Sequence, residues 1–169
     1  MNTDFSANKI IENLFLGSIS ATREDWLRLN KIQAVLTIVH RIAQIPKLPT
    51  NIKHEIILRG DYDSYKPNQI KLALEFIDEN LELNRPTLVH CIAGVNRSAG
   101  IVIAYLIHKR EMSPFKALDF LQEKRSVIYP SHAIFLSVQD YFYGKKEIFC
   151  EKCKKKKLYM TKDPNFCQC

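Results

Sequence analysis

Residues 89–100 read VHCIAGVNRSAG and join an apolar strand-like run to an apolar helix-like run. Residues 87–90 have the composition of a buried strand, and residues 98–109 are apolar almost all round, as in a helix covered on most sides. Gly94 lets the connecting chain turn tightly. The first N–H groups of a helix have no partner within it and point outward with the positive end of its dipole. The stretch therefore predicts an anion-binding loop where a strand meets a helix.

Strand and helix signals alternate on both sides of this loop. Apolar runs with strand character occupy residues 14–16, 35–39 and 54–58. Helical spacing or helix-start residues mark residues 67–82, a segment that begins at Ser113 and Pro114, and residues 131–143. Thr22 is placed to cap a further helix. This alternation predicts an α/β fold: a central, mostly parallel sheet with helices on both faces, and the anion-binding loop between a buried strand and a central helix.

Composition predicts one globular domain, since 46% of the 169 residues are hydrophobic and 25% are charged. The longest apolar run, residues 101–107, is far shorter than the roughly 18 residues that suggest a membrane-spanning helix, so we expect no transmembrane segment. The opening MNTDFSANK has no apolar stretch after a basic start. It favours a cytoplasmic or nuclear protein. The sequence carries no signal for an oligomeric state.

Charge and cysteine content change near residue 144. Residues 145–169 hold eight Lys and three acidic residues, a net charge of +5, against +2 for residues 1–144. Cys91 lies in the first part, and the other cysteines lie in the tail: Cys150, Cys153, Cys167 and Cys169. We therefore expect a folded domain over residues 1–144 and a basic, cysteine-rich tail over residues 145–169.

The tail cysteines leave three interpretations open. Their CEKC and CQC pairs could supply four thiolates to a structural zinc ion, although CxC is a less usual half-site than CxxC. The tail could instead be a solvated lysine-rich segment with exposed thiols. The terminal CxC could also carry a prenyl group beside basic residues that bind a membrane surface. The basic tail keeps nucleic acid open as a partner, but the nearly neutral domain makes this a weaker expectation.

The predicted loop brings a thiol and a guanidinium to one anion. Arg97 follows Cys91 by six residues and can bind phosphoryl oxygens bidentately. A helix N-terminus and a nearby cation favour the thiolate form of cysteine, and Ser98 is placed to donate to the sulfur. We expect Cys91 to attack a phosphate monoester in line, with no metal or other catalytic cofactor. The phosphate-binding residues are then Ile92, Ala93, Gly94, Val95, Asn96 and Arg97.

The leaving oxygen needs a proton, and two carboxylic acids are candidates to supply it. Asp61 and Asp63 both follow the strand predicted at residues 54–58. In an α/β sheet they would lie at the same carboxyl-end edge as Cys91, where such folds bind their ligands. The local sequence does not separate the two.

The pattern HCxxGxxRS, formed by His90, Cys91, Gly94, Arg97 and Ser98, resembles the signature of the small (atypical) dual-specificity protein phosphatases. These belong to the cysteine-dependent protein tyrosine phosphatase superfamily. The likeness extends over about residues 9–143 and includes IIENLFLGS at 10–18, ALEFID at 73–78 and KALDFLQEKRSVIYPSHAIF at 116–135.

The resemblance implies hydrolysis of phosphotyrosine and phosphoserine or phosphothreonine in phosphoprotein substrates, through a cysteinyl-phosphate. In the family the general acid lies about thirty residues before the nucleophile. This favours Asp61, 30 residues ahead of Cys91, over Asp63 at 28. We expect His90 to tune the loop by hydrogen bonding rather than to act as acid or base.

Some departures from the family pattern keep alternatives open. Ser131 stands where the family often has Asn after the Pro of a late loop. Asn96 is found in related RNA 5′-phosphatases, but those usually have His and Thr where this chain has Ala93 and Ser98. Inositide phosphatases generally place Lys in the loop, and none occurs here between Cys91 and Arg97. The alternatives are a phosphate-binding pseudophosphatase module and an RNA 5′-triphosphatase.

Overall fold

The computed structural model describes residues 6–60 and 63–144. Its elements, in chain order, are β1 (Ala7–Ile11), β2 (Leu14–Gly17), η1 (Ile19–Thr22), α1 (Glu24–Leu29), β3 (Ala34–Val39), η2 (Ile42–Gln44), β4 (Lys53–Leu58), α2 (Pro67–Glu82), β5 (Thr87–His90), α3 (Arg97–Arg110), α4 (Pro114–Lys124) and α5 (His132–Tyr143). No helix of this described part is both long and apolar enough to cross a bilayer.

The strands form one sheet in the order β1-β2-β5-β3-β4. The β1–β2 pair is antiparallel, and all other neighbours are parallel, which confirms the mostly parallel sheet. In register, His90 at the end of β5 lies beside Gly17 on β2 and Thr37 on β3. The carboxyl ends of these parallel strands therefore meet at the edge where the loop of residues 91–96 begins.

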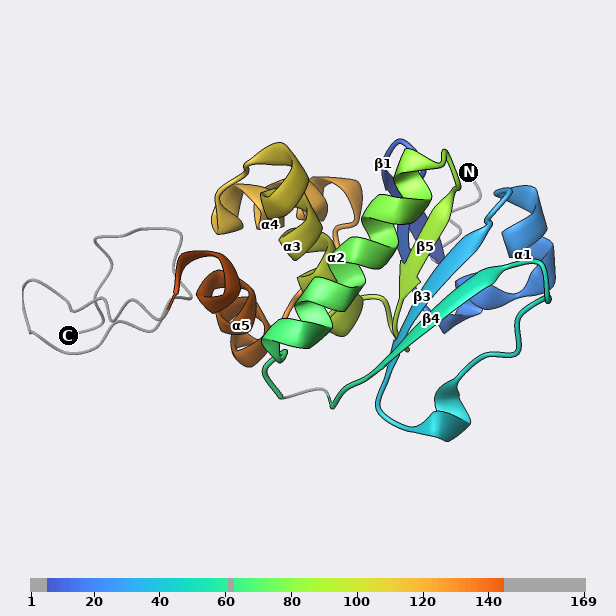
Figure 1. Cartoon of the computed structure of the whole chain (residues 1–169), viewed down its shortest axis with the longest axis horizontal. Helices are drawn as coiled ribbons and strands as arrows, with labels where there is room; N and C mark the ends of the chain where they lie inside the picture. The colour runs from blue at the N-terminus through green and yellow to red at the C-terminus, as the bar shows by residue number, and fades with distance from the viewer. Residues whose placement is uncertain (1–5, 61–62, 145–169) are drawn as a thin grey trace, which may run out of the picture.

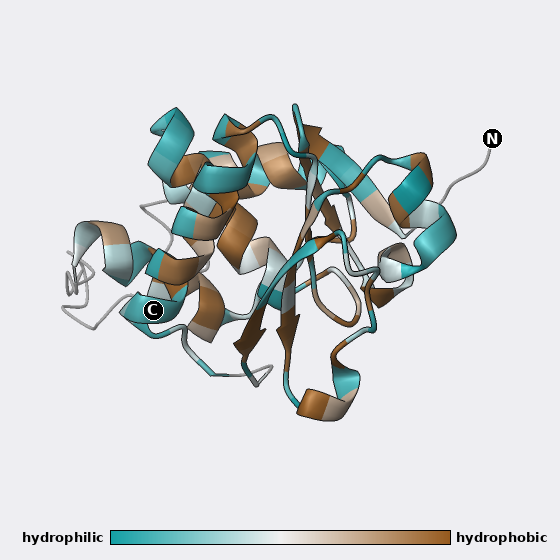
Figure 2. Ribbon diagram, turned by 45° about the vertical axis from the view of Figure 1, so that its right-hand side comes forward, coloured by the Kyte–Doolittle hydropathy of each residue, from teal (hydrophilic) through white to brown (hydrophobic). Residues whose placement is uncertain are grey.

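Helices cover both faces of the sheet unequally. Helices α2, α3, α4 and α5 lie on one side and α1 on the other, as Figure 1 shows. The larger core lies between the sheet and α2–α5, with fully buried Leu36, Ile38, Ile70 and Ile103 among its members. The smaller core packs Trp26 and Leu27 of α1 against Val35 and Leu88. In Figure 2 the central strands are largely brown, and brown stretches alternate with teal along the helices that cover them.

The central helix α3 is enclosed, as its composition predicted. Every residue from 97 to 107 is buried, and the helix contacts α2, α4 and α5 as well as the sheet. Three basic residues, His108, Lys109 and Arg110, stand in its last turn, where cations complement the helix dipole. The end of α3 nearest the loop is thus held within the core.

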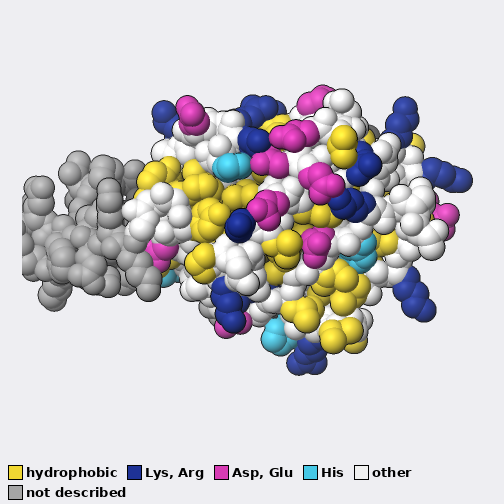
Figure 3. Space-filling model, in the orientation of Figure 1, with side chains coloured by type: hydrophobic (Ala, Val, Ile, Leu, Met, Phe, Trp, Pro, Cys, Tyr) yellow, Lys and Arg dark blue, Asp and Glu magenta, His cyan; other side chains and the backbone are white. Residues whose placement is uncertain are grey.

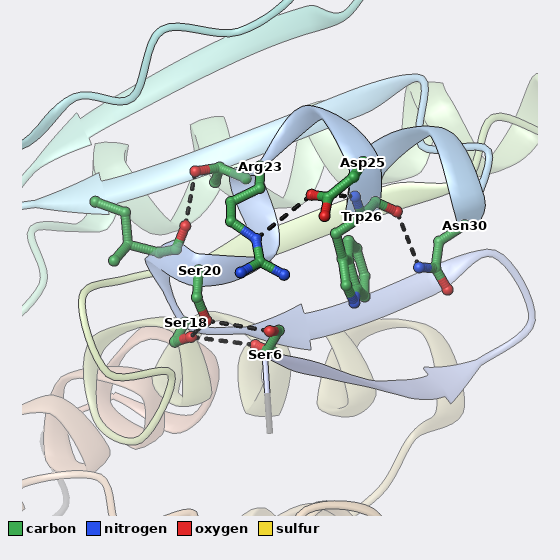
Figure 4. Close-up of polar contacts among 9 residues, drawn as sticks. Ser6, Ser18, Ser20, Arg23, Asp25, Trp26 and Asn30 are labelled. Carbon is green, nitrogen blue, oxygen red and sulfur yellow. Dashed lines mark hydrogen bonds and ion pairs between the residues drawn. The ribbon is translucent and has the colours of Figure 1, made fainter. Parts of the chain in front are cut away.

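Two local features differ from the sequence-based prediction. Strand β1 was not foreseen, and it pairs with β2 across a tight turn in which Asn13 has a φ of 59°. The expected cap at Thr22 is wrong, because its hydroxyl donates to Ile19 O within η1 and Arg23 precedes the helix instead. Figure 4 shows this region, including the hydrogen bonds that join Ser18 and Ser20 to Ser6.

Candidate active site

Strand β5 and helix α3 place the loop of residues 91–96 as the sequence predicted. The loop leans on the end of β2, where Gly17 O accepts from Cys91 N–H at 3.4 Å and Ile92 O accepts from Ile19 N–H at 3.1 Å. Gly94 has a φ of 66°, and a Cβ built on it would lie 2.4 Å from the carbonyl carbon of Gly17. A side chain at Gly94 would therefore clash with the backbone of β2, and only glycine fits this turn.

Two hydrogen-bonding groups lie beside the Cys91 sulfur. Gly94 N–H donates to Sγ at 3.3 Å, and the Ser98 hydroxyl lies 3.2 Å from it. The residue is only 2% exposed, so any group that reaches the sulfur must fit closely into the loop. Both contacts are those that would stabilise a negatively charged sulfur.

Arg97 begins α3 and lies against the segment that follows β4. Its Nη1 donates to Arg59 O at 3.3 Å, and its own carbonyl accepts from the Tyr65 hydroxyl at 2.8 Å. Tyr65 is in turn fixed by its backbone N–H, which donates to Ser137 Oγ at 3.0 Å. These contacts hold the guanidinium at the carboxyl-end edge of the sheet, next to the loop.

Asp61 lies outside the described residues, so its predicted position stays a prediction. Asp63 is exposed. Its carboxylate lies close to Gly60, because a Cβ built on Gly60 would lie 2.6 Å from Asp63 Oδ2. Because the Arg59 carbonyl accepts a hydrogen bond from Arg97, the chain just before this segment lies at the same edge of the sheet as the loop that Cys91 begins.

Arg125, which the sequence analysis did not single out, supports the loop from behind. The residue is 5% exposed and is the C-cap that follows the last residue of α4. Its Nε donates to Gly94 O at 2.9 Å, Nη2 to Ala93 O at 3.5 Å, and Nη1 to Asn8 Oδ1 at 2.7 Å. Because the carbonyl and the N–H of a trans peptide point in opposite directions, the peptides whose carbonyls bind Arg125 direct their N–H groups away from it. Burial lowers the pKa of Arg125, and the nearby Cys91 opposes this.

Asn96 and Ser131, which both depart from the family pattern, lie next to each other. Asn96 Oδ1 accepts from the backbone N–H of Ser131 at 2.7 Å, and Tyr129 N–H donates to Val95 O at 3.0 Å. The Ser131 hydroxyl accepts from Ile134 N–H and caps α5. Asn96 therefore ties the late loop to the anion-binding loop. That gives Asn96 a structural role which needs no RNA substrate.

His90 is buried directly behind Cys91. Its Nδ1 lies 3.3 Å from Cys91 O, and its Nε2 lies 2.7 Å from Thr37 Oγ1. Burial lowers the pKa of His90 to about 4, more than its hydrogen bond to the Cys91 carbonyl raises it. The imidazole is therefore neutral at pH 7, which supports the expectation that it tunes the loop.

This buried imidazole leads to a pH-dependent stability. We expect the free energy of unfolding to fall by about 2 kcal/mol between pH 7 and pH 5 on account of His90. Its pKa is about 4 in the fold, against 6.5 as the ordinary value, so between these values the unfolded chain binds more protons. The contribution is complete above pH 6.5 and is lost as the pH falls toward 4.

Urea unfolding at both pH values measures this effect. The variant His90→Gln should lose less stability on acidification than the original chain. Equal losses in the two proteins would show that His90 is not the group responsible.

The described residues contain no group of three or more His, Cys, Asp or Glu side chains that could hold a metal ion. The predicted zinc site and the division at residue 144 lie outside the described residues, as do the tail cysteines Cys150, Cys153, Cys167 and Cys169.

On the face seen in Figure 3, Lys and Arg are interspersed with Asp and Glu, and no basic stripe crosses it.

Comparison with known proteins gives one consistent family. The family model "Dual specificity phosphatase, catalytic domain" matches residues 14–142. Dual specificity protein phosphatase 1B of Arabidopsis thaliana is 30% identical over 138 residues, which cover 79% of this chain and 80% of that protein. Dual specificity protein phosphatase 9 of Homo sapiens is 34% identical over 126 residues, or 73% of this chain and 33% of the human one.

Solved structures agree with this family in fold. The human tyrosine phosphatase-like serine/threonine/tyrosine-interacting protein superposes with a TM-score of 0.76 at 26% identity, covering 81% of this chain and 95% of that one. The expected sheet, central helix and intervening loop are therefore those of an established architecture.

Proposed function

Because the chain belongs to the dual specificity phosphatase family, we propose that it hydrolyses phosphotyrosine and phosphoserine or phosphothreonine in proteins through a cysteinyl-phosphate. Protein phosphatase activity follows from the family. The observation that supports the covalent mechanism is the Cys91 sulfur, which lies at the start of α3 with the Gly94 N–H at 3.3 Å and the Ser98 hydroxyl at 3.2 Å.

In the first step Cys91 attacks the phosphorus. The sulfur–phosphorus bond forms as the bond to the ester oxygen breaks, and the leaving oxygen takes a proton from Asp61. Charge on the equatorial oxygens is shared by the loop N–H groups of residues 92–97 and by the Arg97 guanidinium. Arg125 contributes indirectly, because it holds the carbonyls of Ala93 and Gly94 away from that charge.

In the second step water attacks the cysteinyl-phosphate. The Asp61 carboxylate takes a proton from this water, phosphate is released, and the sulfur leaves as a thiolate. The Ser98 hydroxyl, 3.2 Å from Sγ, donates to the sulfur as its negative charge returns. No metal ion or other cofactor enters either step of this proposal.

Removing Asp61 tests the assignment of the acid. We expect Asp61→Ala to lower kcat by about 10²- to 10⁴-fold with phenyl phosphate, whose leaving group needs the proton, and far less with an ester of a more acidic phenol. Asp63→Ala serves as the matched control and should behave like the original chain. If Asp63→Ala instead shows the loss that depends on the leaving group, the acid is Asp63.

A phosphate-binding module without turnover is the second candidate. The similarity to a human protein described as tyrosine phosphatase-like and as an interacting protein favours considering it. A panel of phosphopeptides, inositides and triphosphate-ended RNA, each with and without vanadate, separates the candidates. We expect vanadate-sensitive release of phosphate from phosphopeptides. Binding without release would support the module, and release from RNA alone would support an RNA 5′-triphosphatase.

A further inference from the structure

A chain of three polar side chains runs through the sheet behind the catalytic cysteine. Thr37 Oγ1 on β3 lies 2.7 Å from His90 Nε2 on β5 and 2.7 Å from His54 Nε2 on β4. His90 Nδ1 continues the chain to Cys91 O at 3.3 Å. Thr37 and His90 are completely buried, whereas His54 is partly exposed on the edge strand.

The hydroxyl of Thr37 is unusual for its position. Strand β3 reads AVLTIV, and all six of its residues are buried. Apart from Thr37, all of them are apolar. A buried hydroxyl destabilises the fold unless it forms hydrogen bonds. Thr37 lies directly beside His90 in the register of the parallel strands, so its hydroxyl can satisfy the imidazole.

The chemistry of the partners fixes the direction of every hydrogen bond. Cys91 O can only accept, so a neutral His90 must carry its proton on Nδ1 and accept on Nε2. The Thr37 hydroxyl then donates to His90, and its oxygen is left to accept. His54 must therefore donate from Nε2. It can do so both as the doubly protonated ring and as the neutral ring with its hydrogen on Nε2. The order of donation runs from His54 to Thr37, then to His90 and to the Cys91 carbonyl.

Among the residues that the structure describes, the charged groups near these three side chains do not compete for their hydrogens. Burial lowers the pKa of His54, and Glu55, the next residue on β4, opposes this. Because strand side chains alternate, Lys53 and Glu55 point to the other face, where Lys53 pairs with Glu79 of α2 at 2.6 Å. On the face of Thr37, the buried cluster of Trp26, Leu27, Ile32, Val35, Ile52 and Leu88 is apolar.

We propose that His54 is a positioning residue for Cys91, acting through Thr37 and His90; the inference rests on the proposed cysteine mechanism. By donating to the Thr37 oxygen, His54 keeps the Thr37 hydroxyl directed at His90 Nε2. The hydrogen on His90 Nδ1 then stays directed at the Cys91 carbonyl. In a trans peptide the carbonyl and the following N–H point in opposite directions. Fixing the Cys91 carbonyl toward His90 therefore directs the Ile92 N–H away from it, as a loop that binds anions by its N–H groups requires.

The test follows the reaction of the Cys91 thiol with iodoacetate as a function of pH in the full chain. We expect His54→Phe and Thr37→Val to move the midpoint of this reaction to higher pH by about one unit, the effect of one lost hydrogen bond. Thr37→Ser and His54→Gln keep a hydroxyl and an N–H donor, and they should restore the original midpoint. Glu55→Gln, whose side chain points to the other face, is the matched control and should not move it.

A second measurement needs no variant. Nitrogen-15 NMR of the His90 ring in the original chain should show a hydrogen on Nδ1 and none on Nε2, and the opposite tautomer would overturn the proposal. An unchanged midpoint in His54→Phe and Thr37→Val would overturn it too. If the original chain itself reacts at the pH of a free thiol, the failure lies with the proposed mechanism, whereas a low midpoint that the variants share refutes the role of His54 alone.

Discussion

Cys91→Ser should abolish hydrolysis of p-nitrophenyl phosphate, with kcat falling by at least about 10⁴-fold. A serine hydroxyl needs a general base, and among the described residues the groups that contact the Cys91 sulfur are the Gly94 N–H and the Ser98 hydroxyl, neither of which is a base. The neighbouring imidazole of His90 is directed to Thr37 and to the Cys91 carbonyl, and its pKa of about 4 makes it a weak base. The hydroxyl would thus replace the nucleophile without replacing its reactivity.

The same variant should keep its fold and its affinity for phosphate. Oxygen is smaller than sulfur, and the Gly94 N–H and the Ser98 hydroxyl remain available to it. We expect a Tm close to that of the original chain, and inorganic phosphate that still protects the fold against unfolding. If the serine variant turned substrate over at the original rate, Cys91 would not be the nucleophile.

Arg97→Lys should lower kcat/KM for the same substrate by about 10²- to 10³-fold, the loss typical of one donor that stabilises a developing negative charge. Lysine keeps the charge but cannot offer two parallel N–H donors to a phosphoryl group. It would also leave the Arg59 carbonyl without the contact that Nη1 makes at 3.3 Å. The loss should therefore be large although the charge at this position is unchanged.

Arg110→Lys is the matched control for this variant. Arg110 ends the same helix at its far end, where it lies exposed on the surface. We expect its activity to equal that of the original chain. If Arg97→Lys also kept most of its activity, the guanidinium would not be a bidentate partner of the phosphoryl group.

The loop and its helix were predictable because their signals are local. Residues 89–100 contain the strand end, the turn glycine and the helix start, and the backbone donors follow from these alone. The alternation of strands and helices likewise predicted the mostly parallel sheet. Each of these inferences needs only residues that are near one another in the chain.

The supports of the loop were not predictable in the same way. Arg125 reaches Gly94 from 31 residues away, and its contact with Asn8 spans 117. The hydrogen bond between Thr37 and His90 spans 53 residues. Such contacts depend on the order of strands and on the packing of α4, neither of which any local pattern encodes. Thr22 does not cap α1, because its hydroxyl donates to the Ile19 carbonyl within η1.

Trapping the covalent intermediate tests the mechanism most directly. The full chain is mixed with excess p-nitrophenyl phosphate, denatured within one turnover, digested, and its peptides are examined by mass spectrometry. We predict one added phosphoryl group on the peptide that carries Cys91, located on the sulfur and absent from Cys91→Ser. Continued turnover with no phosphorylated Cys91, or a phosphoryl group on another side chain that forms and decays at the rate of turnover, would contradict the mechanism.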